Sequence, residues 1–219
     1  MGGVVFFDID GTLVHGQTQK MLAKYLFKKN QLNFFLILKI YIWFIFFRLY
    51  LIKDAGRIME NSYKLVQGKN TFKIEKLLND FFDKEVKDKI FPAARTIIER
   101  HRREGRKIIL ISNTIQPIVN LISKYLKVES GFGTKLEEKD GFYTGNIIDG
   151  IMYGERKAKF LKNLIGKSKF DFDNSYAYSD HYSDLPVLEM VKNPVVVNPD
   201  KKLAKIAIKN NWSISKFIL

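Results

Sequence analysis

The sequence predicts an α/β fold in which a parallel sheet lies between two layers of helices, with an all-helical segment inserted after the first strand. Two observations predict this arrangement. Short apolar runs, such as 4–7 and 195–197, alternate along the chain with longer segments of helical spacing. Between Gly16 and Gly56 there is no other Gly and no Pro, so helix is permitted throughout this stretch.

The first half of the chain contains one strand and then helices. The run 4–7 is rich in Val and Phe and predicts a buried strand that ends in the polar loop 8–12. Two helices are expected before Gly56, with a break at 30–33. Helical spacing continues over 54–68 and 71–89, and Pro92 ends it.

Beyond Pro92 a pattern of strand, polar loop and helix repeats. We expect helices over 92–103, 115–126 and 155–164, strands over 107–111, 175–178, 195–197 and 212–218, and a hairpin that turns at Asp140-Gly141. Right-handed crossovers would cover both faces of the sheet. We therefore expect a core formed by residues 1–14 and 91–219 and a helical cap formed by residues 15–90.

The charge of the chain favours an anionic partner. The 37 Lys and Arg exceed the 23 Asp and Glu by 14, which suits a nucleic acid, a phosphorylated substrate or an acidic membrane surface. Residues 11–53 contain no acidic residue at all. The cations in this stretch are Lys20, Lys24, Lys28, Lys29, Lys39, Arg48 and Lys53.

The absence of Cys excludes several classes of site. There is no disulfide framework, no thiolate zinc site and no cysteine nucleophile. Three scattered histidines do not suit a histidine-built metal site. A bound metal would therefore have oxygen ligands.

Polar side chains follow three of the predicted strands. They are Asp8, Asp10 and Thr12 after the first, Ser112 and Asn113 after the second, and Asp180 and Asp184 after the third. The carboxyl ends of parallel strands meet at one edge of a sheet, so we expect these groups to lie together. Crowded carboxylates need a cation between them, and hard oxygen ligands in small number suit Mg²⁺. A calcium loop is excluded, because Leu13 and Gln19 stand where it needs Gly and Glu.

Four motifs together resemble those of the haloacid dehalogenase-type phosphatase superfamily. They are Asp8-x-Asp10-Gly-Thr12, Ser112 at a strand end, Lys157 in Gly-Glu-Arg-Lys, and Asp180-x-x-x-Asp184-Leu-Pro. The insert after the first motif and the form of the fourth are similar to the subfamily that contains phosphoserine phosphatase and related hydrolases with a helical cap. The resemblance covers nearly the whole chain and implies a Rossmann-like three-layer core.

The resemblance assigns the reaction to two carboxylates. Asp8 would be the nucleophile and would form an aspartyl-phosphate. Asp10 would protonate the leaving oxygen and later deprotonate the attacking water. Thr12 would form a hydrogen bond within the loop, orient Asp10 and contribute to substrate binding.

The remaining motif residues would bind the phosphoryl group and the metal. Ser112, Asn113 and Lys157 would hold the transferring phosphoryl group. The ligands of Mg²⁺ would be a carboxylate oxygen of Asp8, the backbone carbonyl of Asp10 and the carboxylate of Asp180. Asp184 would pair with Lys157 or with water on the metal.

Three positions near the motifs bear on which substrate the site would take. Phosphoserine phosphatases usually carry Glu, which would pair with the substrate ammonium, where Gln17 stands here. His181 occupies a position where a small residue is more common, and we expect it to point to solvent, the alternative being contact with the leaving group. His15 either faces a substrate pocket on the cap side or simply precedes a cap helix.

Residues 32–52 form the most apolar stretch of the chain and hold eight aromatic residues. A single membrane crossing here would leave Asp8 and Ser112 on opposite sides of the bilayer, so one active site could not form. An all-round apolar helix in a small cap predicts an exposed apolar surface. Its partner would be a membrane interface reached through the basic residues 20–53, a lipid chain or a second subunit in a homodimer, with burial in the cap core as the remaining alternative.

These observations predict a Mg²⁺-dependent phosphomonoester hydrolase. The substrate would be a small phosphorylated metabolite resembling phosphoserine or a lipid phosphate such as phosphatidylglycerophosphate. A nucleic-acid-binding module is a third hypothesis, but it would need aromatics interleaved with basic residues, and here they lie in one apolar run. The chain starts with a strand instead of a signal peptide, which predicts a cytoplasmic protein, with peripheral attachment to the membrane as the alternative.

Overall fold

The computed structural model describes residues 2–48, 51, 60, 62–166 and 171–219, and its centre is a seven-stranded sheet. The strands are β1 (Gly3–Phe7), β2 (Lys107–Ile115), β3 (Ser130–Lys139), β4 (Phe142–Ile148), β5 (Asp171–Ser179), β6 (Asn193–Val197) and β7 (Ser213–Ser215). Their order in the sheet is β4-β3-β2-β1-β5-β6-β7. Neighbouring strands are parallel except for the antiparallel pair β3 and β4. The predicted α/β fold with a mostly parallel sheet is confirmed.

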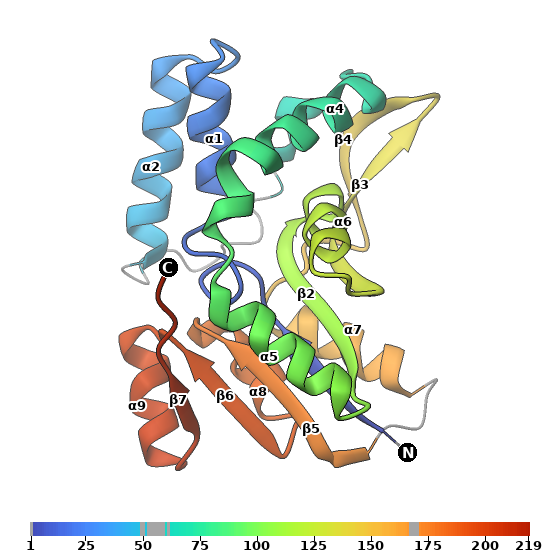
Figure 1. Cartoon of the computed structure of the whole chain (residues 1–219). Coiled ribbons are helices and arrows are strands. Elements are labelled where there is room, and N and C mark those ends of the chain that lie inside the picture. Colours follow the sequence, from blue (N-terminus) through green and yellow to red (C-terminus); the bar gives the residue numbers. More distant parts are fainter. Residues whose placement is uncertain (1, 49–50, 52–59, 61, 167–170) are drawn as a thin grey trace.

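Helices cover both faces of the sheet (Figure 1). They are α5 (Pro92–Arg103), α6 (Gln116–Tyr125), α7 (Glu155–Ile165), α8 (Leu185–Leu188) and α9 (Lys201–Lys209). Successive side chains of a strand point to opposite faces, and β1 shows this clearly. Val5 and Phe7 join a core with α5 and α6, whereas Val4 and Phe6 join a second core with α7, α8 and α9. A strand buried on both faces has to be apolar throughout, which explains the run 4–7.

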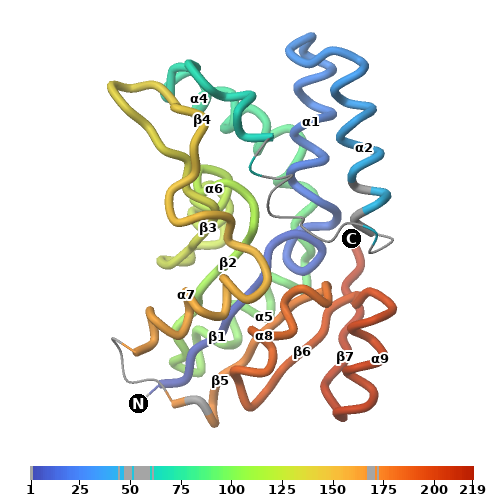
Figure 2. The backbone as a smooth tube through the Cα atoms, turned by 180° about the vertical axis from the view of Figure 1, so that it is seen from behind, coloured from blue at the N-terminus to red at the C-terminus, as the bar shows by residue number. Residues whose placement is uncertain are grey.

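The segment between β1 and α5 contains no strand among its described residues. Its elements are α1 (Thr18–Lys28), α2 (Phe34–Arg48), the 3₁₀ turn η1 (Lys64–Val66), α4 (Thr71–Phe81), the π turn η2 (Phe82–Val86) and the 3₁₀ turn η3 (Lys87–Lys89). Figures 1 and 2 both show α1 and α2 side by side, beyond the ends of the central strands. The expected break at 30–33 is present, and Asn33 caps α2 by accepting a hydrogen bond from the backbone N–H of Leu36. The expected helix 71–89 ends at Phe81 and continues only as short turns.

The hairpin between β3 and β4 also contacts this segment. It turns at Asp140-Gly141 as predicted, and both residues have the positive φ that a tight hairpin turn requires. The backbone of Tyr143 exchanges hydrogen bonds with Gly68 and Lys69. The boundaries of core and cap at 14 and 91 stay a prediction, and this hairpin is one part of the predicted core that contacts the predicted cap.

Strand β2 differs from the prediction, because it extends past residue 111 to Ile115. Ile111 pairs with Phe132 and Ile115 with Thr134, and the register shifts between them. The Ser-Asn-Thr sequence that indicated a loop is therefore an irregular part of the strand. Long-range pairing with β3 overrides the local preference of these residues for turns.

The other expected elements of the second half lie close to their predicted positions. The helices begin and end within about one residue of the expected bounds. Strand β5 begins at Asp171, four residues before the expected 175, and the last strand is shorter than the predicted 212–218. Residues 54–59 and 61 of the predicted helix 54–68 lie outside the described residues; residues 60, 62 and 63 are helical, and Lys64–Val66 form η1. In the described part of the chain, no helix has the length and apolar character needed to cross a bilayer.

Candidate active site

A cavity of about 30 Å³ lies where the carboxyl ends of the central strands meet. The register brings Phe7, the last residue of β1, level with Leu110 of β2 and Tyr178 of β5. Ten residues line the cavity: Asp8, Asp10, Gln17, Asn113, Tyr153, Lys157, Asp180, His181, Ser183 and Asp184. Six of the eight predicted site residues are in this group, and the exceptions are Thr12 and Ser112.

A buried chain of polar contacts crosses the site. The Lys157 ammonium donates a hydrogen bond to Oδ1 of Asp8 at 2.6 Å and another to Asp184 at 2.9 Å. The hydroxyl of Ser179 donates to the same Asp184 carboxylate at 2.8 Å. All four side chains are buried. Burial of these charges without water is costly unless they are paired, and here each one has a partner.

Burial raises the pKa of Asp8 to about 7, although the charge of Lys157 acts in the opposite direction. The nearby carboxylates of Asp184 and Asp10 raise it further. Burial also raises the pKa of Asp180 well above its usual range, with Asp8 as the next cause. For Lys157, burial alone would lower the pKa, but Asp184 and Asp8 outweigh it and raise the pKa. The site therefore holds more negative charge than one ammonium neutralises.

Asp10 is held by Thr18, the first residue of α1. One carboxylate oxygen accepts a hydrogen bond from the Thr18 backbone N–H at 2.6 Å, and the other accepts from its hydroxyl at 3.1 Å. The Thr18 and Thr114 hydroxyls are 3.0 Å apart, which links this contact to β2. Burial raises the pKa of Asp10 to about 6, although the two Thr18 hydrogen bonds lower it. A carboxyl with this pKa can hold or release a proton near neutral pH.

The expected role of Thr12 differs from its contacts in the structure. Its hydroxyl donates to Asp180 at 3.4 Å, and Asp10 is oriented by Thr18 instead. Thr12 is fully buried and does not reach the cavity. The loop residue before it, Gly11, has a φ of +84°, and a Cβ there would collide with the Asp180 carboxylate. Gly11 thus allows the loop after β1 to approach Asp180 closely.

Ser112 and Asn113 are placed differently. Asn113 lines the cavity, as predicted for a group that binds substrate. Ser112 is fully buried in β2, and its hydroxyl accepts a hydrogen bond from the backbone N–H of Thr114 at 3.2 Å. The predicted contact between Ser112 and a phosphoryl group stays a prediction.

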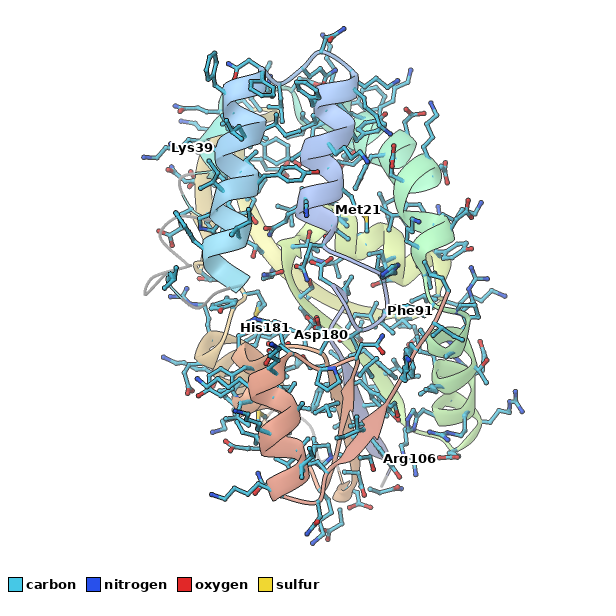
Figure 3. All side chains as sticks on the ribbon, turned by 90° about the vertical axis from the view of Figure 1, so that its left-hand side faces the viewer. Met21, Lys39, Phe91, Arg106, Asp180 and His181 are labelled. Atoms are coloured by element: carbon cyan, nitrogen blue, oxygen red, sulfur yellow. The ribbon has the colours of Figure 1, made fainter. Side chains whose placement is uncertain are left out.

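His181 lies in the wall of the cavity, next to Asp180 (Figure 3), rather than pointing away into solvent as expected. Its Nδ1 accepts a hydrogen bond from the Ser183 backbone N–H at 3.1 Å and lies 2.9 Å from the Ser183 hydroxyl. Burial lowers the pKa of His181, so the neutral ring is favoured. His15 is exposed beside Phe91 and is not part of the cavity wall.

No sequence pattern indicated that Tyr153 and Ser183 line the cavity or that Thr18 holds Asp10. The type of each residue is common at helix starts and in loops. Thr18 lies eight residues after Asp10, and whether its hydroxyl contacts that carboxylate depends on how α1 packs. Only the three-dimensional arrangement identifies these residues.

The oxygen donors around the cavity suit a hard cation. Asp8 and Asp180 repel each other, and a cation bound between them would relieve that repulsion. In the described part of the chain, no three His, Cys, Asp or Glu side chains form a cluster that could hold a metal ion by themselves. Mg²⁺ commonly uses only one or two carboxylates and completes its coordination with water and phosphate oxygens. The residues present therefore fit Mg²⁺.

Comparison with protein families identifies the chain. The family model of the haloacid dehalogenase-like hydrolases matches residues 5–189. The chain belongs to this family. The prediction of a hydrolase of the haloacid dehalogenase superfamily is thereby confirmed.

Relatives of known name extend over almost the whole chain. A probable phosphatase of Mycobacterium tuberculosis is 30% identical over 218 residues, which are 97% of this chain and 74% of that protein. Phosphoserine phosphatase SerB1 of the same species is 26% identical over 97% of this chain and 70% of its own length.

Solved structures share the fold of this haloacid dehalogenase-like hydrolase. A protein of unknown function from Bordetella pertussis superposes with a TM-score of 0.87 at 21% identity, over 98% of both chains. A phospho-aspartyl intermediate analogue of phosphoserine phosphatase superposes with a TM-score of 0.64 at 17% identity, over 98% of this chain and 93% of the other. At these identities the two structures establish the α/β fold.

Proposed function

We propose that this hydrolase cleaves phosphate monoesters through an aspartyl-phosphate formed on Asp8, with Mg²⁺ as its cofactor. The observation that carries the proposal is the arrangement around Asp8. Its buried carboxylate has one oxygen on the Lys157 ammonium and lies in the same small cavity as Asp10. Relatives named as phosphatases support the same reaction class.

Two carboxylates would share the chemistry. An Asp8 oxygen would attack phosphorus, the bond to the leaving oxygen would break, and Asp10 would give that oxygen its proton. In the second step Asp10 would take a proton from a water that attacks phosphorus. The Asp8–phosphate bond then breaks and releases inorganic phosphate. The raised pKa of Asp10, about 6, suits a group that must both give and accept a proton.

The other residues would hold the phosphoryl group in place. The Lys157 ammonium would neutralise charge on the phosphoryl oxygens, and Asn113 would donate a hydrogen bond to one of them. Asp184 and Ser179 keep the ammonium directed at Asp8. Mg²⁺, held by Asp8, Asp180 and the Asp10 carbonyl, would supply further positive charge to the phosphate when bound.

The cavity wall restricts the class of substrate. Apart from the four carboxylates already assigned, its side chains are Lys157 and the neutral groups of Gln17, Asn113, Tyr153, His181 and Ser183. Gln17 stands where an acidic residue would bind the ammonium of phosphoserine, so this wall favours an ester with a neutral, hydroxyl-bearing leaving group. A small phosphorylated metabolite is the first candidate. A lipid phosphate, such as phosphatidylglycerophosphate, is the second, and the exposed apolar side chains of α2 favour it.

Removal of divalent cations is expected to abolish the activity. In EDTA the rate of phosphate release should fall by roughly a hundredfold or more, because a bound cation contributes several kcal/mol to phosphoryl transfer. The measurement is phosphate release from phosphoserine, a sugar phosphate, a nucleotide and a detergent-dispersed lipid phosphate, before and after added Mg²⁺. Asp180→Asn should raise the Mg²⁺ concentration needed for half-maximal rate. Equal rates with and without EDTA would contradict the cofactor assignment.

Replacement of Thr18 by Val is expected to slow the reaction by about tenfold, because it removes one of the two hydrogen bonds to the Asp10 carboxylate. The loss should be larger for alkyl phosphates than for an aryl phosphate, whose leaving group needs little protonation. Thr18→Ser keeps the hydroxyl and is the matched control. Equal losses for both leaving groups would show that Thr18 does not act through Asp10.

A further inference from the structure

Helix α2 is apolar on its outer surface as well as on its inner one. Every residue from Phe34 to Trp43 is exposed or half-buried, and none is fully buried. Among the described side chains of the helix, the most exposed apolar ones are Phe35 at 79%, Phe34 at 61% and Ile45 at 56%. Helix α2 packs on α1 and lies at the edge of the described part of the molecule (Figures 1 and 2).

The exposed side chains form one continuous stripe. We define the α2 stripe as Phe34, Phe35, Leu38, Ile42, Ile45 and Phe46, all of which are exposed. At 100° per residue these six positions occupy about 120° of the helix circumference. The half-buried residues, such as Ile37, Ile40 and Trp43, fall on the remaining arc, which includes the side toward α1. A helix that packs on the protein along one side can lie with its axis parallel to a flat apolar layer and contact it through such a stripe.

The surroundings of the α2 stripe are basic. Lys39 lies at its margin (Figure 3), about 20° beyond Phe46 at 100° per residue. Lys20 and Lys24 are exposed on one face of α1, and the Lys20 ammonium lies 4.6 Å from the ring centroid of Tyr41 on α2. Neither helix contains an acidic residue. Lys28 and Lys29, by contrast, face Glu85 and Asp80 and are partly neutralised.

We propose that the α2 stripe docks this protein on an anionic lipid bilayer, with α2 lying in the plane of the interface. The aromatic and aliphatic side chains of the stripe would enter the boundary between headgroups and acyl chains. Lys20, Lys24 and Lys39 would face the anionic headgroups. Docking depends on this surface alone and not on the reaction assigned to Asp8.

Self-association through the same stripe is disfavoured by the charges. In a symmetric dimer the same patch contacts its own copy. Lys39 is two residues from the middle of α2, so a pairing of the two helices about their midpoints would bring both Lys39 residues close together. With no acidic residue in α1 or α2, those cations would have no partner across the interface. An anionic bilayer supplies the missing negative charge.

Vesicle sedimentation with the full chain tests the proposal. The probes are vesicles of phosphatidylcholine alone and of phosphatidylcholine with phosphatidylglycerol, at low and high salt. The stripe variant is Phe35→Gln, Ile42→Gln and Ile45→Gln, which keeps good helix formers on an exposed surface. The matched control is Phe72→Gln with Ile208→Gln, since these side chains are 72% and 69% exposed on other helices. Lys24→Gln with Lys39→Gln tests the charges.

We expect the wild type and the matched control to sediment with the anionic vesicles, and less with the neutral ones. The stripe variant should bind the anionic vesicles at least roughly tenfold more weakly than the wild type, because apolar contact with the bilayer is lost. The lysine variant should lose mainly the salt-sensitive part. Wild-type protein that stays in the supernatant would overturn the proposal. A concentration-dependent dimer of the wild type, seen by analytical ultracentrifugation and absent from the stripe variant, would also overturn it in favour of self-association.

Hydrolysis of a soluble aryl phosphate separates this proposal from the proposed function. The stripe variant should keep the wild-type rate in solution, because none of its three residues lines the cavity. If the wild type binds vesicles and the stripe variant binds them more weakly, but neither protein hydrolyses any phosphate ester, the docking surface stands and the proposed reaction fails. A stripe variant that has lost both this activity and the circular dichroism spectrum of the folded protein has unfolded. The lysine variant then tests the proposal. If the lysine variant binds anionic vesicles at low salt as well as the wild type does, the electrostatic part of the proposal is overturned.

Discussion

Asp8→Asn is expected to lower the rate of phosphate release by roughly four orders of magnitude or more, since loss of a nucleophile removes the covalent route entirely. The amide has the size of the carboxylate but cannot attack phosphorus. The fold should be retained, because Lys157 keeps its contact with Asp184. The free energy of unfolding should stay the same or rise, since the variant no longer buries a carboxylate near Asp184 and Asp10.

Covalent labelling shows whether this loss has the proposed cause. Wild-type protein that is quenched in acid during turnover of a radiolabelled phosphate ester should carry label, and Asp8→Asn should carry none. Asp140→Asn is the matched control, because Asp140 is exposed at the hairpin turn and Asn also accepts its positive φ. Label retained in the Asp8 variant at the level of the control would exclude Asp8 as the attacking group.

Much of this site could be predicted because parallel strands place their carboxyl ends at one edge. The apolar runs locate β1 and β5, so the carboxylates that follow them, Asp8 and Asp180, have to converge. Lys157 could be assigned only through the resemblance to a family, since nothing local separates it from the other lysines on α7. In the structure, Lys157 differs from these other lysines because it is buried between two carboxylates.

Other features depend on contacts between distant parts of the chain. Ser112 and Asn113 have turn-forming neighbours, yet β2 continues through them because Ile115 pairs with Thr134 of β3. Thr18 holds Asp10 only because α1 begins at the mouth of the site. For α2, the apolar composition predicted an exposed surface, but which side of the helix is exposed depends on how it packs on α1.

Lys157→Met is expected to have the largest effect on stability. It should lower the free energy of unfolding by about 3 kcal/mol, because a buried ion pair that loses one partner leaves an uncompensated charge. It should also reduce phosphate release to near the level of Asp8→Asn, because the ammonium that would bind the phosphoryl group is missing. The carboxylates of Asp8 and Asp184 would stay buried without a cation. Chemical denaturation followed by circular dichroism measures the change. Lys159→Met is the matched control, since Lys159 lies on the same helix and is exposed.

The double variant Lys157→Met with Asp184→Asn separates loss of pairing from loss of packing. If the cost comes from the unpaired carboxylates, removing one of them should restore part of the stability, so the double variant should be more stable than Lys157→Met alone. Activity should not return, because the ammonium that would bind the phosphoryl group is still missing. A double variant whose loss equals the sum of the two single losses would show that Lys157 and Asp184 are energetically independent. The contact of 2.9 Å between them would then contribute nothing to holding the ammonium at Asp8.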